Sequence, residues 1–198
     1  MQNMTRLHQQ MAFILEIDKL KHILRRTSLL DMSRRENDAE HSWHLAMMAI
    51  VLAEYAAPEV NISRVIRMVL LHDLVEIDAG DTFLYDDVHA ESKAEREQQA
   101  ADRIYGLLPK DIGEELVNLW HEFEERKTPD AKFAACMDRI QPVLHNYFTQ
   151  GGTWKIADAS HERAMSHMLF IKEASEPLFA LVESLMSDAV ENGFLKRE

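Results

Sequence analysis

A histidine and an aspartate stand side by side in a stretch that is otherwise apolar. His72 and Asp73 are flanked by aliphatic residues from Leu70 to Val75. Burying both polar side chains costs free energy unless each is paired or bound to something. A divalent cation satisfies both, and an imidazole beside a carboxylate suits Zn, Mn, Fe, Co or Ni better than Ca. The pair alone does not establish a metal site, because one residue could pack in the core while the other faces solvent.

Two further residues of the same chemical kinds lie far from this pair in the sequence. His41 falls in the first turn of a helix expected to begin at Asn37, and Asp138 falls in the middle of a later predicted helix. A helical fold that brings these two residues to the His-Asp pair supplies four ligands of mixed nitrogen and oxygen type. Such a set leaves coordination positions open for water and substrate, which is typical of a catalytic metal site.

The order of His41, His72, Asp73 and Asp138 resembles the H…HD…D signature of the HD-domain metal-dependent phosphohydrolases. Residues 37–42, 72–81 and 131–138 carry a more specific resemblance to the branch that contains bacterial 5′-deoxynucleotidases. The resemblance implies an HD-domain helical bundle and one divalent transition metal (Mn, Co, Ni, Zn or Fe, with Mg as a further option). It also implies hydrolysis of a small phosphate ester, a (deoxy)nucleoside 5′-monophosphate, to nucleoside and phosphate.

Two more carboxylates follow the His-Asp pair. Glu76 comes four residues after His72 and three after Asp73, so on a continuing helix the three share a face. A carboxylate beside a metal-bound water is placed to take its proton. From the residues alone, the simpler interpretation makes Glu76 a solvated residue at a helix end and Asp81 a loop cap. The resemblance implies that Glu76 acts on the attacking water and that Asp81 is a second active-site carboxylate.

Four arginines lie in or beside the link that precedes the first histidine of the signature, and they are Arg25, Arg26, Arg34 and Arg35. Guanidinium groups fit phosphate oxygens in a bidentate manner. The resemblance implies that one arginine of this segment contacts the substrate phosphate, and Arg25 or Arg26 is its counterpart. The deoxynucleotidases usually place a tryptophan directly after this arginine and this chain does not, so the resemblance does not choose between the two. Arginine pairs in a link are otherwise usually solvated.

The elements that must position these residues are predicted to be helical almost throughout, because apolar residues recur at three- and four-residue spacing. We expect one all-α domain of about eight helices over residues 1–198, with a motif-bearing core over about 10–150 and C-terminal helices over 151–198. The link over 27–37 is expected to be irregular, and no strand is predicted. Helices are expected over 5–25, 37–55, 63–77, 91–107, from Pro109, from Thr128, and over 160–173 and 176–191. Asn37 with Glu40 forms a predicted capping box, and Ser63 and Thr128 are predicted caps.

The composition of the chain disfavours several classes of protein. The 198 residues are 46% apolar, and 22 basic against 34 acidic residues give a net charge of −12. A strongly acidic protein disfavours duplex nucleic acid as a partner. One cysteine excludes a disulfide framework and suits a reducing cytoplasm. No run approaches the length of apolar sequence that spans a membrane. We therefore expect a cytoplasmic protein, and the resemblance implies a homodimer.

Two other classes of function remain open at the sequence level. The same fold type also includes phosphodiesterases and mixed-valent di-iron oxygenases, which would need further ligands. His44, one turn after His41, is the nearest candidate, although His44 and His145 are most simply core histidines. A non-catalytic nucleotide-binding or scaffold protein with a structural metal is the third possibility. The acidic Glu76 beside the predicted ligands argues against it.

Overall fold

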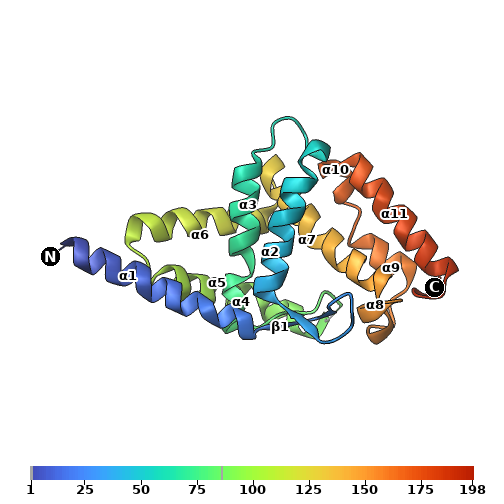
Figure 1. Ribbon diagram of the computed structural model, residues 1–198, viewed down its shortest axis with the longest axis horizontal. Helices are drawn as coiled ribbons and strands as arrows, with labels where there is room; N and C mark the ends of the chain where they lie inside the picture. Colours follow the sequence, from blue (N-terminus) through green and yellow to red (C-terminus); the bar gives the residue numbers. More distant parts are fainter. Residues whose placement is uncertain (1, 86) are drawn as a thin grey trace.

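The computed structural model describes residues 2–85 and 87–198 and confirms the predicted all-α architecture (Figure 1). No helix in these two ranges combines the length and apolar character that crossing a bilayer requires. The α-helices are α1 (Gln2–Ile17), α2 (Asp38–Val51), α3 (Ile62–Leu71), α4 (Glu76–Ala79), α5 (Asp87–Tyr105), α6 (Lys110–Glu125), α7 (Pro129–Phe148), α8 (Gly152–Ile156), α9 (His161–Ser166), α10 (Ile171–Ala174) and α11 (Glu176–Glu191). Short 3-10 helices are η1 (Asp18–His22), η2 (Ala53–Tyr55) and η3 (His72–Val75).

A short antiparallel hairpin replaces the end of the predicted first helix and the predicted irregular link. Its strands are β1 (Leu24–Ser28) and β2 (Arg35–Asn37), with Leu24 opposite Asn37. The prediction was wrong because the strands are only five and three residues long, too short for a clear period-two pattern. Their pairing depends on packing against α7 and α8, which is tertiary information. The hairpin carries both Arg25 and Arg26.

Helix caps explain where several helices begin. The Asn37 side chain accepts from the Glu40 backbone N–H at 3.0 Å, and the Glu40 carboxylate accepts from the Asn37 N–H at 3.2 Å. This is the predicted capping box, and it sets the start of α2. The predicted cap at Thr128 before α7 is also confirmed. The cap of α3 is Asn61 rather than Ser63, because the Asn61 side chain accepts from the Arg64 N–H.

The helix predicted over 63–77 is interrupted where the chemistry is concentrated. The α-helix ends at Leu71, the chain tightens into η3 over the His-Asp pair, and α4 follows. All four residues of η3 are buried. Further along, the helix predicted over 160–173 is divided into α9 and α10, and the short α8 was not predicted. Helix α11 has the bounds that were predicted.

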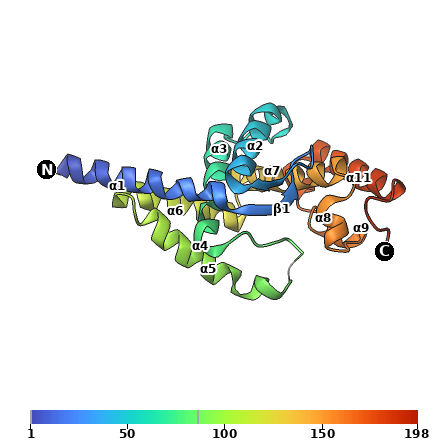
Figure 2. The ribbon, with the colours of Figure 1, turned by 60° about the horizontal axis from the view of Figure 1, so that its bottom comes forward.

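Two hydrophobic cores meet around the interrupted helix. Figures 1 and 2 show how the helices that contribute to them are arranged. One core joins α2, α3 and α7 to the C-terminal α11, where Val182 and Met186 are fully buried. The other core joins α1, η3, α5 and α6. Leu71, the last residue of α3, packs against both cores. The His-Asp pair that follows is therefore held on two sides. That the whole chain forms one domain stays a prediction.

The two candidate caps of α3 can be compared directly. We expect Asn61→Ala to lower the free energy of unfolding by about 1 kcal/mol, because it removes the side-chain oxygen that accepts from the Arg64 N–H. We expect Ser63→Ala, an exposed position inside the helix, to change it by less than about 0.5 kcal/mol. Chemical denaturation of both variants measures the difference. A larger loss at Ser63 than at Asn61 would contradict the cap assignment.

Candidate metal centre

The structure brings the four predicted metal ligands together from three helical segments. His41 comes from the first turn of α2, His72 and Asp73 from η3, and Asp138 from the middle of α7. His41 Nε2 lies 3.1 Å from Asp138 Oδ1 and 4.0 Å from Asp73 Oδ2. His72 Nε2 lies 3.0 Å from Asp73 Oδ1 and 3.6 Å from Asp138 Oδ1. All four side chains are buried.

The hydrogen bonds of His72 support a cation among these ligands. Its Nδ1 lies 2.9 Å from the Val69 carbonyl oxygen, which can only accept, so Nδ1 carries the hydrogen. In the neutral ring the lone pair of Nε2 then faces two carboxylates, and among the described residues Nε2 has no hydrogen-bond partner. Ligand atoms of His41, His72 and Asp138 all lie within 4.8 Å of one another. These residues fit a divalent cation of the kind that imidazole and carboxylate bind together.

The charges of the ligands depend on one another. Burial opposes protonation of His72, but Asp73 and Asp138 outweigh burial and raise its pKa to about 10. Burial works against ionisation of Asp73, yet His72 and Arg25 lower its pKa to about 2. The two histidines and two carboxylates thus attract positive charge strongly. Because protons and a metal compete for the same lone pairs, metal binding here displaces protons.

A second group of carboxylates adjoins the ligands. Oxygen atoms of Asp38, Asp73 and Glu76 lie within 4.8 Å of one another, and all three residues are buried. Burial, followed by repulsion from Asp73, raises the pKa of Asp38 to about 7. Burial, with Asp73 and Asp38 next in effect, raises the pKa of Glu76 well above its usual value. The carboxylates of this group therefore oppose one another's ionisation.

Asp38 was not predicted as a site residue. It lies three residues before His41, so both side chains project from the same face of α2. That spacing was the available signal. Asp81 was predicted as a site residue, and the structure brings it to the same region. Gly80 has a φ of 76°, a left-handed conformation that favours glycine, and it ends α4 so that the chain turns back.

The structure separates the two candidate arginines. The Arg25 guanidinium lies 3.1 Å from Asp73 Oδ2, 3.5 Å from Asp38 Oδ1 and 4.0 Å from Asp81 Oδ1. Its side chain is 13% exposed, whereas Arg26 is exposed. Among the other two arginines of the segment, Arg34 pairs with Glu40 and Arg35 donates to backbone oxygens of β1.

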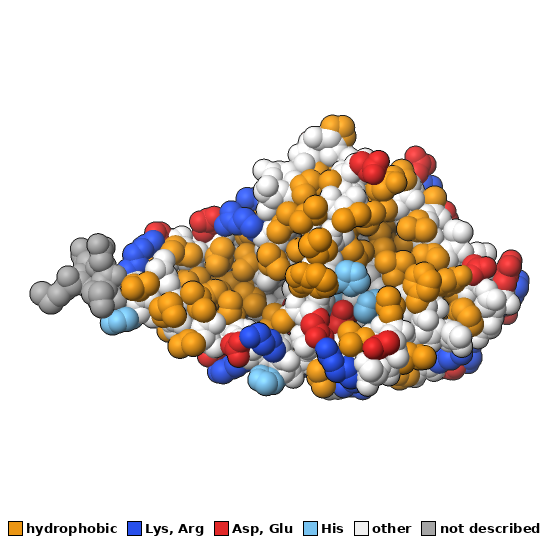
Figure 3. Space-filling model, in the orientation of Figure 1, with side chains coloured by type: hydrophobic (Ala, Val, Ile, Leu, Met, Phe, Trp, Pro, Cys, Tyr) orange, Lys and Arg blue, Asp and Glu red, His pale blue; other side chains and the backbone are white. Residues whose placement is uncertain are grey.

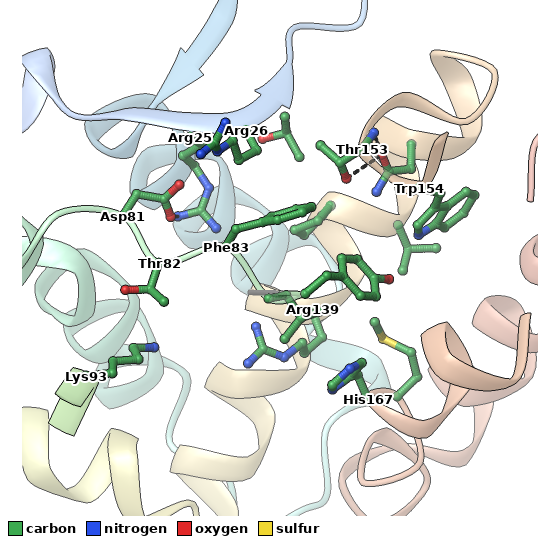
Figure 4. A pocket seen from close by; sticks show the side chains of 17 residues that line it. Arg25, Arg26, Asp81, Thr82, Phe83, Lys93, Arg139, Thr153, Trp154 and His167 are labelled. Atoms are coloured by element: carbon green, nitrogen blue, oxygen red, sulfur yellow. Dashed lines mark hydrogen bonds and ion pairs between the residues drawn. The ribbon is translucent and has the colours of Figure 1, made fainter. Parts of the chain in front are cut away.

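A cavity of about 350 Å³ opens beside these residues (Figure 4). Arg25, Asp81, Thr82 and Lys93 line one end of it, and Trp154 lies at the other. Cavities of about 300–1,000 Å³ hold small molecules in proteins. The cavity therefore provides room for a substrate whose reacting group lies beside the metal ligands.

A separate polar network lies behind His41. Gln141 Nε2 lies 2.8 Å from Glu36 Oε1, 3.0 Å from His145 Nε2 and 3.5 Å from His44 Nδ1. The amide nitrogen thus lies among the three residues that could otherwise hold a second cation. Glu36 Oε2 lies 3.7 Å from His41 Nδ1, so the network adjoins a predicted metal ligand. Sequence reasoning missed Glu36 and Gln141, because their contact joins β2 to α7 across 105 residues of sequence.

Comparisons with known proteins agree with this geometry. A family model described as HD domain matches residues 17–178. A crystal structure of a protein named predicted metal-dependent phosphohydrolase, from Magnetospirillum magnetotacticum MS-1, is 53% identical and covers 96% of each chain with a TM-score of 0.94. An HD-domain phosphohydrolase from Listeria innocua is 18% identical, covers 87% of this chain and 97% of that one with a TM-score of 0.57, and is similar in fold alone.

Curated relatives match a shorter part of the chain. The 5′-deoxynucleotidase HDDC2 of Homo sapiens is 33% identical over 114 residues, which are 58% of this chain and 54% of that protein. This chain therefore spans about half the length of the curated relatives it matches.

The elevated pKa of His72 predicts that the thermal stability of the metal-free protein depends on pH, and that added metal opposes this dependence. A histidine whose pKa rises from 6.5 to about 10 on folding stabilises the fold below pH 6.5 and loses this effect as the pH rises. We expect the Tm of metal-stripped protein to fall between about pH 6.5 and pH 9. Added Mn²⁺ should oppose the fall, because metal binding strengthens as the histidines lose protons. Differential scanning fluorimetry measures both.

Two separate histidine-to-glutamine variants test whether His72 causes this pH dependence, one at His72 and one at a control position. His72→Gln should flatten the dependence of Tm on pH in the metal-stripped protein, whereas His121→Gln on α6 should leave it unchanged. Equal pH profiles for the two variants would show that His72 is not the group responsible.

Proposed function

The chain belongs to the HD-domain family, and we propose that it is a metal-dependent phosphohydrolase that converts (deoxy)nucleoside 5′-monophosphates to nucleoside and phosphate. The observation that carries this proposal is the meeting of the four ligands with Glu76 and Arg25 beside one cavity. The names of the relatives support the same class of reaction, since a full-length match is named a metal-dependent phosphohydrolase and partial matches are named 5′-deoxynucleotidases.

His41, His72, Asp73 and Asp138 would hold the metal. A bound divalent ion polarises a phosphoryl oxygen and lowers the pKa of a bound water. Mixed imidazole and carboxylate ligands suit Mn, Co, Ni, Zn or Fe, with Mg as a further option. The ligand that would join a di-iron pair, His44, lies instead with Glu36, His145 and the Gln141 amide, which favours one metal for each chain.

Glu76 takes the proton of the attacking water in this proposal. It is buried within the carboxylate group that adjoins the metal ligands, and burial and its acidic neighbours raise its pKa. A carboxylate with a raised pKa is a stronger base than an exposed one when it is ionised. Asp38, its neighbour in this group, adds negative charge that favours the protonated form of Glu76. Asp81, which lines the cavity, orients the water or a sugar hydroxyl.

Arg25 holds the substrate phosphate in this proposal. Its guanidinium lines the cavity at the end where Asp73 and Asp81 lie, so it reaches the place where the reacting group must sit. Arg26 also lines the cavity but is exposed, which makes it the second candidate. A guanidinium offers two parallel N–H donors to a phosphate, which a lysine ammonium cannot do.

The activity proposal predicts metal-dependent release of phosphate. Metal-stripped protein given a panel of 5′-ribo- and deoxyribonucleotides, with Mg, Mn, Co, Ni, Zn or Fe added singly, should release phosphate from at least one nucleotide. Glu76→Gln should lower kcat by about 10²–10⁴-fold with little change in KM, because it removes the proton acceptor but keeps the shape. Release that needs no metal, or that survives Asp138→Asn unchanged, would contradict the proposal.

A matched pair of variants tests the phosphate contact in the same assay. Arg25→Lys keeps a positive charge but loses the bidentate contact, so KM should rise. Arg26→Lys should change KM less. A larger rise for Arg26→Lys would move the phosphate contact to that residue.

We further propose that the protein is a homodimer that pairs through α2. Trp43, Met47, Ile50 and Val51 are all exposed, and their spacing places them along one face of the helix. Figure 3 shows hydrophobic side chains gathered over this helix. Contiguous exposed apolar surface of this kind marks protein interfaces, and symmetric dimers are the commonest soluble oligomers.

Light scattering coupled to size-exclusion chromatography tests the dimer. The molar mass measured for the wild-type protein should be twice the mass of one chain. Trp43→Glu should shift it towards the monomer, because it places a charge in the apolar face. Ile156→Glu, which changes an exposed apolar residue of α8, is the control and should leave the mass unchanged. A monomeric wild type would contradict the proposal.

A further inference from the structure

The end of the cavity that lies away from the metal ligands is built largely from the C-terminal third of the chain, where the sequence offered no motif. Asn146 comes from the end of α7, Thr153 and Trp154 from α8, and His167 from the segment after α9. Phe83, from the loop after Asp81, extends towards Thr153 and Trp154 (Figure 4). The activity proposal accounts for the metal end of the cavity and leaves the chemistry of this opposite end unexplained.

Aromatic rings make this end suited to a flat ligand. The Phe83 and Tyr85 ring centroids are 5.3 Å apart in an edge-to-face arrangement, and Tyr85 and His167 are 5.7 Å apart in the same manner. Trp154 is buried and hydrogen-bonds to Tyr85 through its side chain. Rings that hold each other in this way offer fixed π surfaces, on which nucleobases stack regardless of their identity. The aromatic contacts explain binding of a base, but not a choice among bases.

Asn146 supplies a polar contact with a defined direction. Its side-chain oxygen accepts from the Thr153 backbone N–H at 2.6 Å and from the Thr153 hydroxyl at 2.9 Å. A backbone N–H can only donate, so the atom facing it must be the amide oxygen, and the orientation of the amide is settled. Because Oδ1 is engaged by Thr153, the two N–H groups of Nδ2 are the donors that Asn146, a lining residue of the cavity, has for a ligand. Asn146 is therefore a fixed donor at the aromatic end.

The cavity has an acidic lining residue at its metal end, away from Asn146. Among the described residues that line it, Asp81 is the one carboxylate, and it lies 4.0 Å from Arg25 at the metal end. The other charged side chains of the lining, Arg26, Lys93 and Arg139, are donors. A carbonyl oxygen of a ligand can accept from the Asn146 amide, whereas an amino group of a ligand would meet that donor with a second donor.

We propose that the aromatic end of the cavity binds the nucleobase and that Asn146 selects keto bases over amino bases. This inference rests on the proposed nucleotidase function and adds a specificity-determining residue to it. Uracil, thymine, guanine and hypoxanthine present a carbonyl oxygen where cytosine and adenine present an amino group. The Asn146 amide donates to the carbonyl. Against an amino group it brings two donors together and leaves both without a partner, which is costly in a buried site.

Matched substrates test this selection without a change in shape. dUMP and dCMP differ at the relevant position only by oxygen against nitrogen, as do dIMP and dAMP. We expect kcat/KM to favour at least one keto member over its amino counterpart by about tenfold or more, the loss expected when a buried donor is left unpaired. Equal kcat/KM within both pairs would overturn the proposal.

The decisive variant is Asn146→Asp. It keeps an oxygen that accepts from Thr153, so the contact to α8 is preserved, and it replaces the donor with an acceptor. We expect the preference within each pair to reverse in favour of the amino base. The added negative charge also weakens binding of the phosphate, but it does so equally for both members, so the ratio is unaffected. Asn118→Asp, an exposed substitution on α6 with the same change of charge, should keep the wild-type ratio.

Binding of nucleosides separates this inference from the hydrolytic function. Isothermal titration calorimetry with uridine and cytidine, which carry no phosphate, should give tighter binding of uridine to the wild type and of cytidine to Asn146→Asp. If the protein hydrolyses no nucleotide but shows this reversal, the nucleotidase proposal fails and the base selection stands. The opposite outcome is hydrolysis of nucleotides in which Asn146→Asp changes neither the ratio of kcat/KM between keto and amino nucleotides nor the ratio of affinities for uridine and cytidine. In that case the base selection is wrong and the hydrolase stands. Absence of nucleoside binding in both proteins likewise overturns the base selection.

Discussion

Charged groups that are cut off from water need a compensating charge close by, and most of this structure can be understood from that constraint. Two histidines and two aspartates converge between α2, η3 and α7 with little exposure to solvent. The Nε2 atom of His72 faces the Asp73 and Asp138 carboxylates and has no hydrogen-bond partner among the described residues. A divalent cation at their centre satisfies all four groups together. The surrounding elements hold this arrangement in place, from the capping box at Asn37 to the polar network around Glu36.

The same constraint explains the raised pKa values in the second group of acidic residues. Asp38 and Glu76 are buried against Asp73, so burial first, and then repulsion from neighbouring carboxylates, raises the pKa of both. Arg25 offsets part of this charge from the hairpin. One end of the cavity thus adjoins a possible cation site, a group of buried carboxylates and a guanidinium. Phosphoryl transfer needs little covalent chemistry from a protein, and under the proposed function these groups would supply the positioning and charge that it does need.

Much of the site could be predicted from the sequence, because its ligands fall in short motifs that keep their spacing in any helical fold. The capping box at Asn37 and the cap at Thr128 were local signals and are confirmed. The hairpin, the break of the helix at Leu71 and the short α8 were not predictable, since each depends on contacts with distant parts of the chain. The roles of Asp38, Glu36 and Asn146 were missed for the same reason. Each depends on a neighbour that only the folded chain brings close, such as Thr153 for the Asn146 amide.

The central claim is that His41, His72, Asp73 and Asp138 together hold one metal ion. Metal analysis by inductively coupled plasma mass spectrometry on protein purified without added metal or chelator tests it most directly. We predict one transition-metal ion for each chain in the wild type, and its loss in both His72→Ala and Asp138→Asn at unchanged helical content by circular dichroism. Metal content that is unchanged in these variants, or two iron ions for each chain, would contradict the account.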